Sequence, residues 1–244
     1  MKTIILALTL TLLLACSNGS KDTTAASTTE VLETKTTETL QKAPKVVTEA
    51  TLDLTRHGIA NNPNNVLGGL KVGELAPDIE LENQDGKVIS LDSKLKEGPV
   101  LLVFYRADWC SICRRHLAEF EDKIKDIHTA GAANVIAVSP QKKEYSRELR
   151  KANNYSFPIL FDEDHQTMKD YKVFFHATEK YNQYILEAKG DPIEVRNGDT
   201  DPVMPVPATY LIGQDKKLKY VHYDPNYRER ADLSEVLKAI ESQG

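Results

Sequence analysis

Two cysteines three residues apart, Cys110 and Cys113, carry the chemistry that this sequence suggests most directly. They lie where the apolar run Val100–Phe104 gives way to a helical pattern. A thiolate is both the nucleophile and the leaving group in disulfide exchange. A working pair therefore needs one sulfur at a cationic helix start and a second sulfur within bonding reach. The spacing predicts a redox-active dithiol.

The two sulfurs are expected to have different roles. Cys113 falls on the apolar stripe of the helix, whereas Cys110 lies at or just before its first turn. Unpaired N–H groups and the helix dipole favour an anionic sulfur at that place, and Arg106, Arg114 and Arg115 are expected to add positive charge nearby. We therefore expect Cys110 to be the exposed, attacking thiolate and Cys113 to resolve the mixed disulfide, which leaves a Cys110–Cys113 disulfide.

Other interpretations of the same segment remain open. Trp109 is either a packed aromatic or a flat apolar surface on which partners dock. Haem attachment is excluded because Arg114, and not histidine, follows the second cysteine. Metal binding through Cys110, Cys113 and His116 would need a fourth ligand from elsewhere in the chain.

The beginning of the chain resembles an export signal. A charged start precedes the apolar run from Ile4 to Ala15, which is too short to cross a bilayer that needs roughly 20 residues. The run ends Leu13-Leu14-Ala15-Cys16, which is similar to a bacterial lipoprotein cleavage box. We expect residues 1–15 to be a lipoprotein signal peptide, with Cys16 lipidated and the protein held on a membrane of the cell envelope, facing the periplasm or exterior. An ordinary secretory signal is the alternative.

The amino-acid composition indicates how the rest of the chain is organised and which partners it excludes. Residues 16–66 are rich in Thr, Glu and Lys without a sustained apolar period, which predicts a disordered tether, and residues 67–244 suit one globular domain. The chain has 31 basic and 36 acidic residues, so nucleic acid is not an expected partner. No cofactor is implied, and two thiols besides Cys16 cannot build a four-cysteine zinc site.

The apolar periodicity predicts an alternation of strands and helices. Strands are expected at 79–81, 88–91, 100–104, 135–138, 159–161, 208–212 and 218–221. Helices are expected over 113–127, 143–153, near 165–171, over 179–189 and over 229–242. Residues 172–204 form an insertion, with a possible hairpin around 192–195. The order indicates an α/β fold with an N-terminal β-hairpin and a central mixed sheet flanked by helices.

Three segments of the chain resemble a known family. Val72-Gly73-Glu74-Leu75-Ala76-Pro77-Asp78, the run Phe104–Cys113 and Val206-Pro207-Ala208-Thr209 are similar to segments of the thioredoxin-like superfamily, in its alkyl hydroperoxide reductase and thiol-specific antioxidant branch. This branch includes peroxiredoxins and membrane-tethered thiol-disulfide oxidoreductases. The resemblance implies that Pro207 is the superfamily's cis-proline, which leaves the preceding backbone free to pair with a partner's extended chain beside the dithiol.

The departures from the family pattern decide which activity to expect. Where peroxiredoxins carry a proline, a threonine and an arginine that orient peroxide, this chain has Arg106, Cys110 and Pro207. The expected function is therefore thiol-disulfide exchange on protein or small thiol substrates. A thiol peroxidase is the first alternative, with hydroperoxide substrates, Cys113 as the peroxidatic sulfur and Arg106 as a partial replacement for the missing arginine. A metal-handling or partner-binding module is the second.

Overall fold

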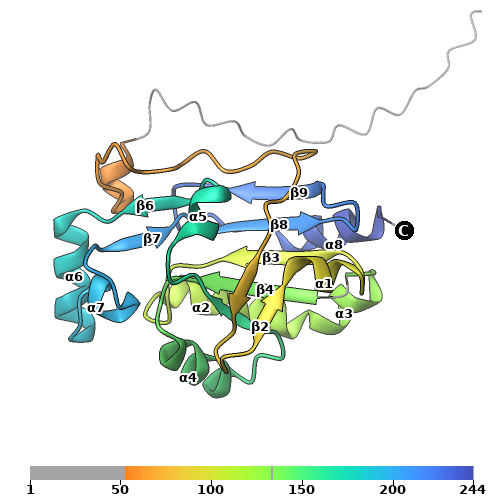
Figure 1. Ribbon diagram of the computed structural model, residues 1–244, viewed down its shortest axis with the longest axis horizontal. Coiled ribbons are helices and arrows are strands. Elements are labelled where there is room, and N and C mark those ends of the chain that lie inside the picture. The colour runs from red at the N-terminus through yellow and green to blue at the C-terminus, as the bar shows by residue number, and fades with distance from the viewer. Residues whose placement is uncertain (1–52, 133, 244) are drawn as a thin grey trace, which may run out of the picture. The chain divides into compact units, whose positions relative to one another are not determined.

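A five-stranded mixed sheet forms the centre of the computed structural model, which describes residues 53–132 and 134–243 (Figure 1). Its strands follow the order β5-β4-β3-β8-β9. β3 (Val100–Phe104) runs parallel to β4 (Asn134–Ser139), which runs parallel to β5 (Ile159–Phe161). On its other side β3 is antiparallel to β8 (Ala208–Ile212), and β8 is antiparallel to β9 (Leu218–Tyr223). The expected α/β fold with a mixed sheet is confirmed.

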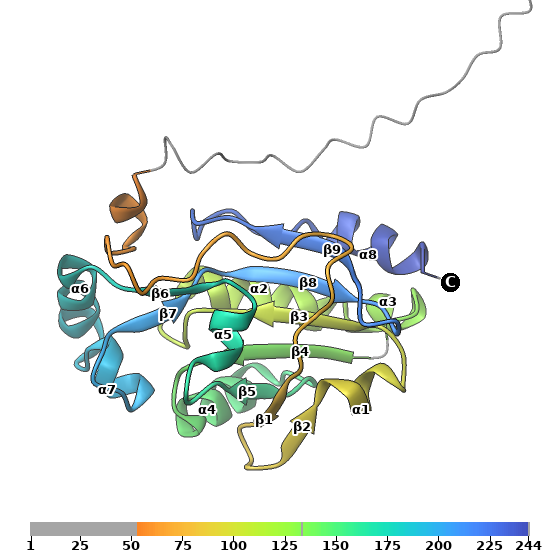
Figure 2. The same cartoon turned by 45° about the horizontal axis from the view of Figure 1, so that its top comes forward.

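β3 leads directly to the cysteines and is buried along its whole length. All five of its residues are at most 2% exposed, as expected for an apolar run buried on both faces. In Figures 1 and 2, α2 (Ser111–Asp122), α3 (Ile124–Thr129) and α8 (Leu233–Glu241) lie behind the sheet. The helix expected over 113–127 is interrupted at Lys123, although Ile127 keeps its place in the core.

The N-terminal hairpin is present. β1 (Glu80–Glu82) pairs antiparallel with β2 (Val88–Ser90), and Gly86 takes the positive φ that the turn between them needs. The short helix α1 (Leu91–Leu95) follows directly. The helix α4 (Lys143–Asn153) occupies the predicted range, and α5 (Gln166–Asp170) lies within its predicted segment.

The insertion has more regular structure than its sequence suggested. β6 (Phe174–His176) and β7 (Val203–Pro205) form a separate antiparallel pair, and α6 (Glu179–Lys189) has its predicted bounds. The hairpin expected around 192–195 was wrong, because those residues begin α7 (Ile193–Asn197). Pro192 precedes this helix, where a missing N–H costs nothing, and the buried Ile193 anchors it. Figure 2 shows α6 and α7 beyond one end of the five-stranded sheet.

The folded part begins earlier than expected, which shortens the predicted tether. Asp53 caps a 3₁₀ helix, η2 (Leu54–His57), and Ile59 is 1% exposed and bridges to Ala177. Val66 bridges to Phe174, so isolated apolar residues fasten this segment to the insertion without any periodic pattern. The predicted signal peptide, Cys16 and the tether up to residue 52 lie outside the described residues. Among the described helices, none is long and apolar enough to cross a membrane.

Candidate active site

Cys110 and Cys113 form a disulfide at the start of α2. Their Cα atoms are 5.2 Å apart, so the expected bonding reach between them is confirmed. Cys110 is the N-cap residue of the helix, and its Sγ accepts the backbone N–H of Cys113 at 3.2 Å. A sulfur at this position receives both a direct hydrogen bond and the positive end of the helix dipole.

The expected exposure of Cys110 was wrong for this disulfide-bonded state. Cys110 is 4% exposed and Cys113 is 1% exposed, so both are buried. The cover over Cys110 includes Arg106, whose Nη2 donates to Cys110 Sγ at 3.3 Å. The side chains that hold Arg106 there come from distant parts of the chain, which local sequence does not reveal.

Arg106 is a buried cation held by aromatic rings. Its Nη1 donates to the Tyr181 hydroxyl at 2.8 Å, and its guanidinium lies 3.7 Å from the centre of the Tyr227 ring. Burial lowers the pKa of Arg106. Within the described part of the chain, Arg106 makes no ion pair with a carboxylate, and its Nη2 donates to the sulfur of Cys110 instead.

Cys113 also has a guanidinium beside it. Arg230 Nη2 lies 3.5 Å from Cys113 Sγ, and Arg230 comes from the loop between β9 and α8. Sequence reasoning missed this residue, because 117 positions separate it from Cys113 and no local motif marks it. By contrast, Arg114 and Arg115, which were expected to add positive charge, are exposed on α2.

Trp109 is packed and does not form an exposed docking surface. It is 7% exposed, and its ring lies 6.2 Å from that of Tyr181 on α6. Arg106 also faces its ring, at 5.4 Å. Trp109 therefore helps to close the site from the side of the insertion.

The backbone beside Pro207 is not free to bind an extended partner chain, contrary to the expectation. Pro207 is buried, and the N–H of Val206, the residue before it, donates to the Val173 carbonyl at 2.7 Å. The preceding strand β7 pairs with β6 along its length. The insertion thus fills, within the same chain, an edge at which strand addition would otherwise occur. The isomer of the bond before Pro207 stays a prediction.

An ion pair fastens the insertion to the loop before the cysteines. Both carboxylate oxygens of Asp108 accept from Arg196 Nη2 on α7, at 2.9 and 2.8 Å. The Arg196 side chain is 8% exposed and that of Asp108 is 25% exposed. Asp191 is a weaker partner, 3.8 Å from Arg196 and 46% exposed.

An Asp108→Ala variant is expected to lower the free energy of unfolding by about 2 kcal/mol, because it leaves the Arg196 guanidinium buried without its main partner. The matched Asp191→Ala change should cost less than about 1 kcal/mol, since that pair is longer and more exposed. Urea unfolding of the two variants beside the wild type measures both values. Equal losses would show that Asp108 is not the main partner of Arg196.

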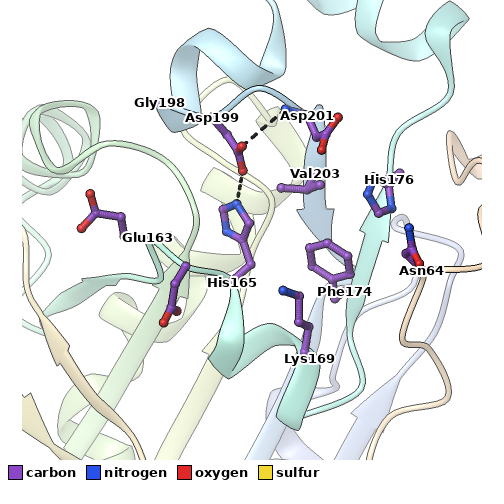
Figure 3. Close-up of a pocket in the computed structure, with 11 residues that line it drawn as sticks. Asn64, Glu163, His165, Lys169, Phe174, His176, Gly198, Asp199, Asp201 and Val203 are labelled. Carbon is purple, nitrogen blue, oxygen red and sulfur yellow. Dashed lines mark hydrogen bonds and ion pairs between the residues drawn. The ribbon is translucent and has the colours of Figure 1, made fainter.

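One cavity lies away from the cysteines. It has a volume of about 670 Å³ and opens between α5, β6 and the end of α7. Figure 3 shows His165 hydrogen-bonded to Asp199 at its wall, with Phe174 and His176 nearby. Neither cysteine lines this cavity, so we place the chemistry at the disulfide. No group of three or more His, Cys, Asp or Glu side chains among the described residues is arranged to hold a metal ion.

The sequence and the fold are similar to those of known proteins. The model of the AhpC/TSA family matches residues 72–221. Peroxiredoxin Q, chloroplastic, from Triticum aestivum is 31% identical over 153 residues, 62% of this chain and 70% of that protein. The protein of the same name from Oryza sativa subsp. japonica is 30% identical over 152 residues, 61% and 69% of the two chains. The crystal structure of Peroxidoxin BcpB from Mycobacterium tuberculosis superposes with a TM-score of 0.55 at 20% identity, covering 71% of this chain and 97% of that one.

Proposed function

Because the chain belongs to the AhpC/TSA family and is therefore a thiol-dependent oxidoreductase, we propose that it is a peroxidase for small hydroperoxides that cycles through the Cys110–Cys113 disulfide. One observation carries this proposal. The dithiol site is enclosed by the chain's own side chains, and each sulfur lies within 3.5 Å of an arginine Nη2.

The enclosure favours a small oxidant over a protein disulfide. A protein substrate would have to place its own sulfur against Cys110, which is 4% exposed beneath Arg106. It would also have to dock without the Val206 N–H, which is already bonded to Val173. A hydroperoxide group has only two oxygens and needs a much smaller opening. Exchange with proteins, which the sequence favoured, is therefore the second choice.

The proposed oxidation has two balanced steps. The Cys110 thiolate attacks the terminal oxygen of the hydroperoxide, so an S–O bond forms, the O–O bond breaks and the alkoxide takes a proton to leave as the alcohol. The Cys113 thiolate then attacks the sulfur of the Cys110 sulfenic acid, which forms the disulfide and releases hydroxide that leaves as water. Two equivalents of an external thiol return the disulfide to the dithiol by successive exchange.

The geometry favours Cys110 as the sulfur that meets peroxide. It accepts two N–H donors, one from the helix backbone and one from Arg106, and both stabilise a thiolate. Cys113 has Arg230 at a longer 3.5 Å. In the alternative assignment, which follows from the resemblance of the Phe104–Cys113 segment to peroxiredoxins, Cys113 is the peroxidatic sulfur. The Cys110→Ser and Cys113→Ser variants distinguish the two assignments.

A side-by-side assay tests the function. We expect the wild type, supplied with dithiothreitol, to consume hydrogen peroxide or tert-butyl hydroperoxide catalytically, and to reduce the disulfides of insulin at a rate little above that of dithiothreitol alone. A variant that lacks both cysteines gives the background of each assay. Rapid insulin reduction with peroxide consumption at the background rate would replace the proposal by thiol-disulfide exchange on proteins.

A further inference from the structure

The loop between β9 and α8, residues 224–232, supplies two side chains to the disulfide site. Tyr227 stacks against the Arg106 guanidinium, and Arg230 reaches Cys113. Arg230 Nη1 also donates to the Glu229 carbonyl at 2.9 Å, which fixes the guanidinium within its own loop. This irregular loop therefore belongs to the site, although it follows the cysteines by more than a hundred residues in the chain.

Arg230 keeps its positive charge beside Cys113. Burial lowers the pKa of Arg230 to about 10, which still leaves it protonated at neutral pH. His116 lies on the same face of α2 as Cys113, but burial lowers its pKa to about 4, so it is neutral at pH 7. Burial lowers the pKa of His222 as well. The charged and titratable groups that act on Arg230 are Arg106, Arg115, His116, Glu119, His222 and Asp224.

Arg230 also lacks a carboxylate partner within 4 Å among the described residues. A partly buried guanidinium without such a partner is stabilised when an anion forms beside it. In the disulfide, Cys113 Sγ carries no charge. When the bond opens, the same sulfur can become a thiolate 3.5 Å from the guanidinium. The contact is thus strongest in the state that reduction produces.

We propose that Arg230 is a catalytic residue that holds Cys113 as a thiolate, both when Cys113 attacks the oxidised Cys110 and when an external thiol expels it. The first role rests on the proposed function. The second requires only that a thiol reduces the disulfide. In that step the external thiolate bonds to Cys110 Sγ, the Cys110–Cys113 bond breaks and its electron pair goes to Cys113. A thiol that ionises more readily leaves faster, so the guanidinium accelerates the step.

Reduction of the purified disulfide by dithiothreitol tests the leaving-group role without peroxide. We expect Arg230→Gln to slow reduction about tenfold, and Arg230→Lys to recover part of the rate, because lysine keeps the charge in a different geometry. Arg228→Gln is the matched control: it removes the same charge from the same loop at an exposed position, and should react like the wild type.

Alkylation gives a second readout that a purely structural role would not move. In a Cys110→Ser background the rate of iodoacetamide reaction at Cys113 rises with pH, and Arg230→Gln should move its midpoint upward by about one pH unit. If Arg230→Gln matches Arg228→Gln in both measurements, the inference is overturned. Should the glutamine variant fail to fold, Arg230→Met, which also removes the charge but keeps much of the side-chain volume, takes its place, and the same match would overturn the inference. A wild type that is reduced in an Arg230-dependent way but does not consume peroxide would overturn the proposed function alone.

Discussion

A Cys110→Ser variant is expected to lose peroxide turnover by a factor of about a thousand or more, because a serine hydroxyl stays protonated at neutral pH where a cysteine beside Arg106 can ionise. Cys113→Ser should slow sustained turnover as well, for a different reason. Its Cys110 can still reduce one equivalent of peroxide, but Cys113 is no longer there to close the disulfide, so an external thiol must reduce the sulfenic acid before the next turnover.

A single equivalent of peroxide distinguishes the losses of activity in Cys110→Ser and Cys113→Ser. Each reduced variant is mixed with one equivalent of hydrogen peroxide, and the sulfenic acid is trapped with dimedone and located by mass spectrometry. We expect a dimedone adduct on Cys110 in Cys113→Ser and almost none on Cys113 in Cys110→Ser. The reverse pattern would assign peroxide attack to Cys113, which is the role that the resemblance to peroxiredoxins gives it.

Local patterns were sufficient for most of the elements that position this pair. The range of α4 could be predicted to the residue, because amphipathic spacing is a local property. The interruption of the helix at Lys123 could not be predicted, because the apolar period continues across it into α3. The pairing of β6 with β7 joins two three-residue segments across a whole insertion, and strands so short leave almost no period to detect.

The site itself was only half predictable. Spacing placed the two cysteines together, because three residues at a helix start bring the sulfurs within bonding reach. Their burial depends on Tyr181, Tyr227 and Arg230, which arrive from α6 and from the β9–α8 loop. The residues next to Cys110 in the sequence do not predict those contacts. The expectation that Cys110 is exposed was therefore wrong, whereas the expectation that it can bond to Cys113 is confirmed.

An Arg106→Gln variant is expected to slow peroxide reduction at pH 7 by a factor of about ten to one hundred. The guanidinium donates directly to Cys110 Sγ at 3.3 Å and has no carboxylate partner among the described residues that would neutralise it. Without this positive charge, the Cys110 thiolate forms at a higher pH. The rate should therefore recover as the pH rises, and its midpoint should lie about one to two pH units above that of the wild type.

The measurement is the second-order rate of peroxide reaction between pH 5 and 10, followed in a Cys113→Ser background so that Cys110 is the only cysteine of the pair that can react. Arg114→Gln is the control, because it removes the same charge from the exposed face of the same helix start. A lower rate in Arg106→Gln that keeps the wild-type midpoint at every pH would contradict a role in ionising Cys110, and would make Arg106 a residue that shapes access alone.

Protein stability separates these two roles further. Arg106 is 3% exposed and donates to the Tyr181 hydroxyl, so its loss changes the packing of α6 against the site. Removing a buried charge can nevertheless leave stability unchanged or increase it, because desolvation of a cation is costly. Arg106→Lys keeps a charge near Cys110 but cannot reproduce the planar donation to both Tyr181 and the sulfur. If electrostatics dominates, this variant keeps a midpoint close to that of the wild type even when its unfolding free energy falls.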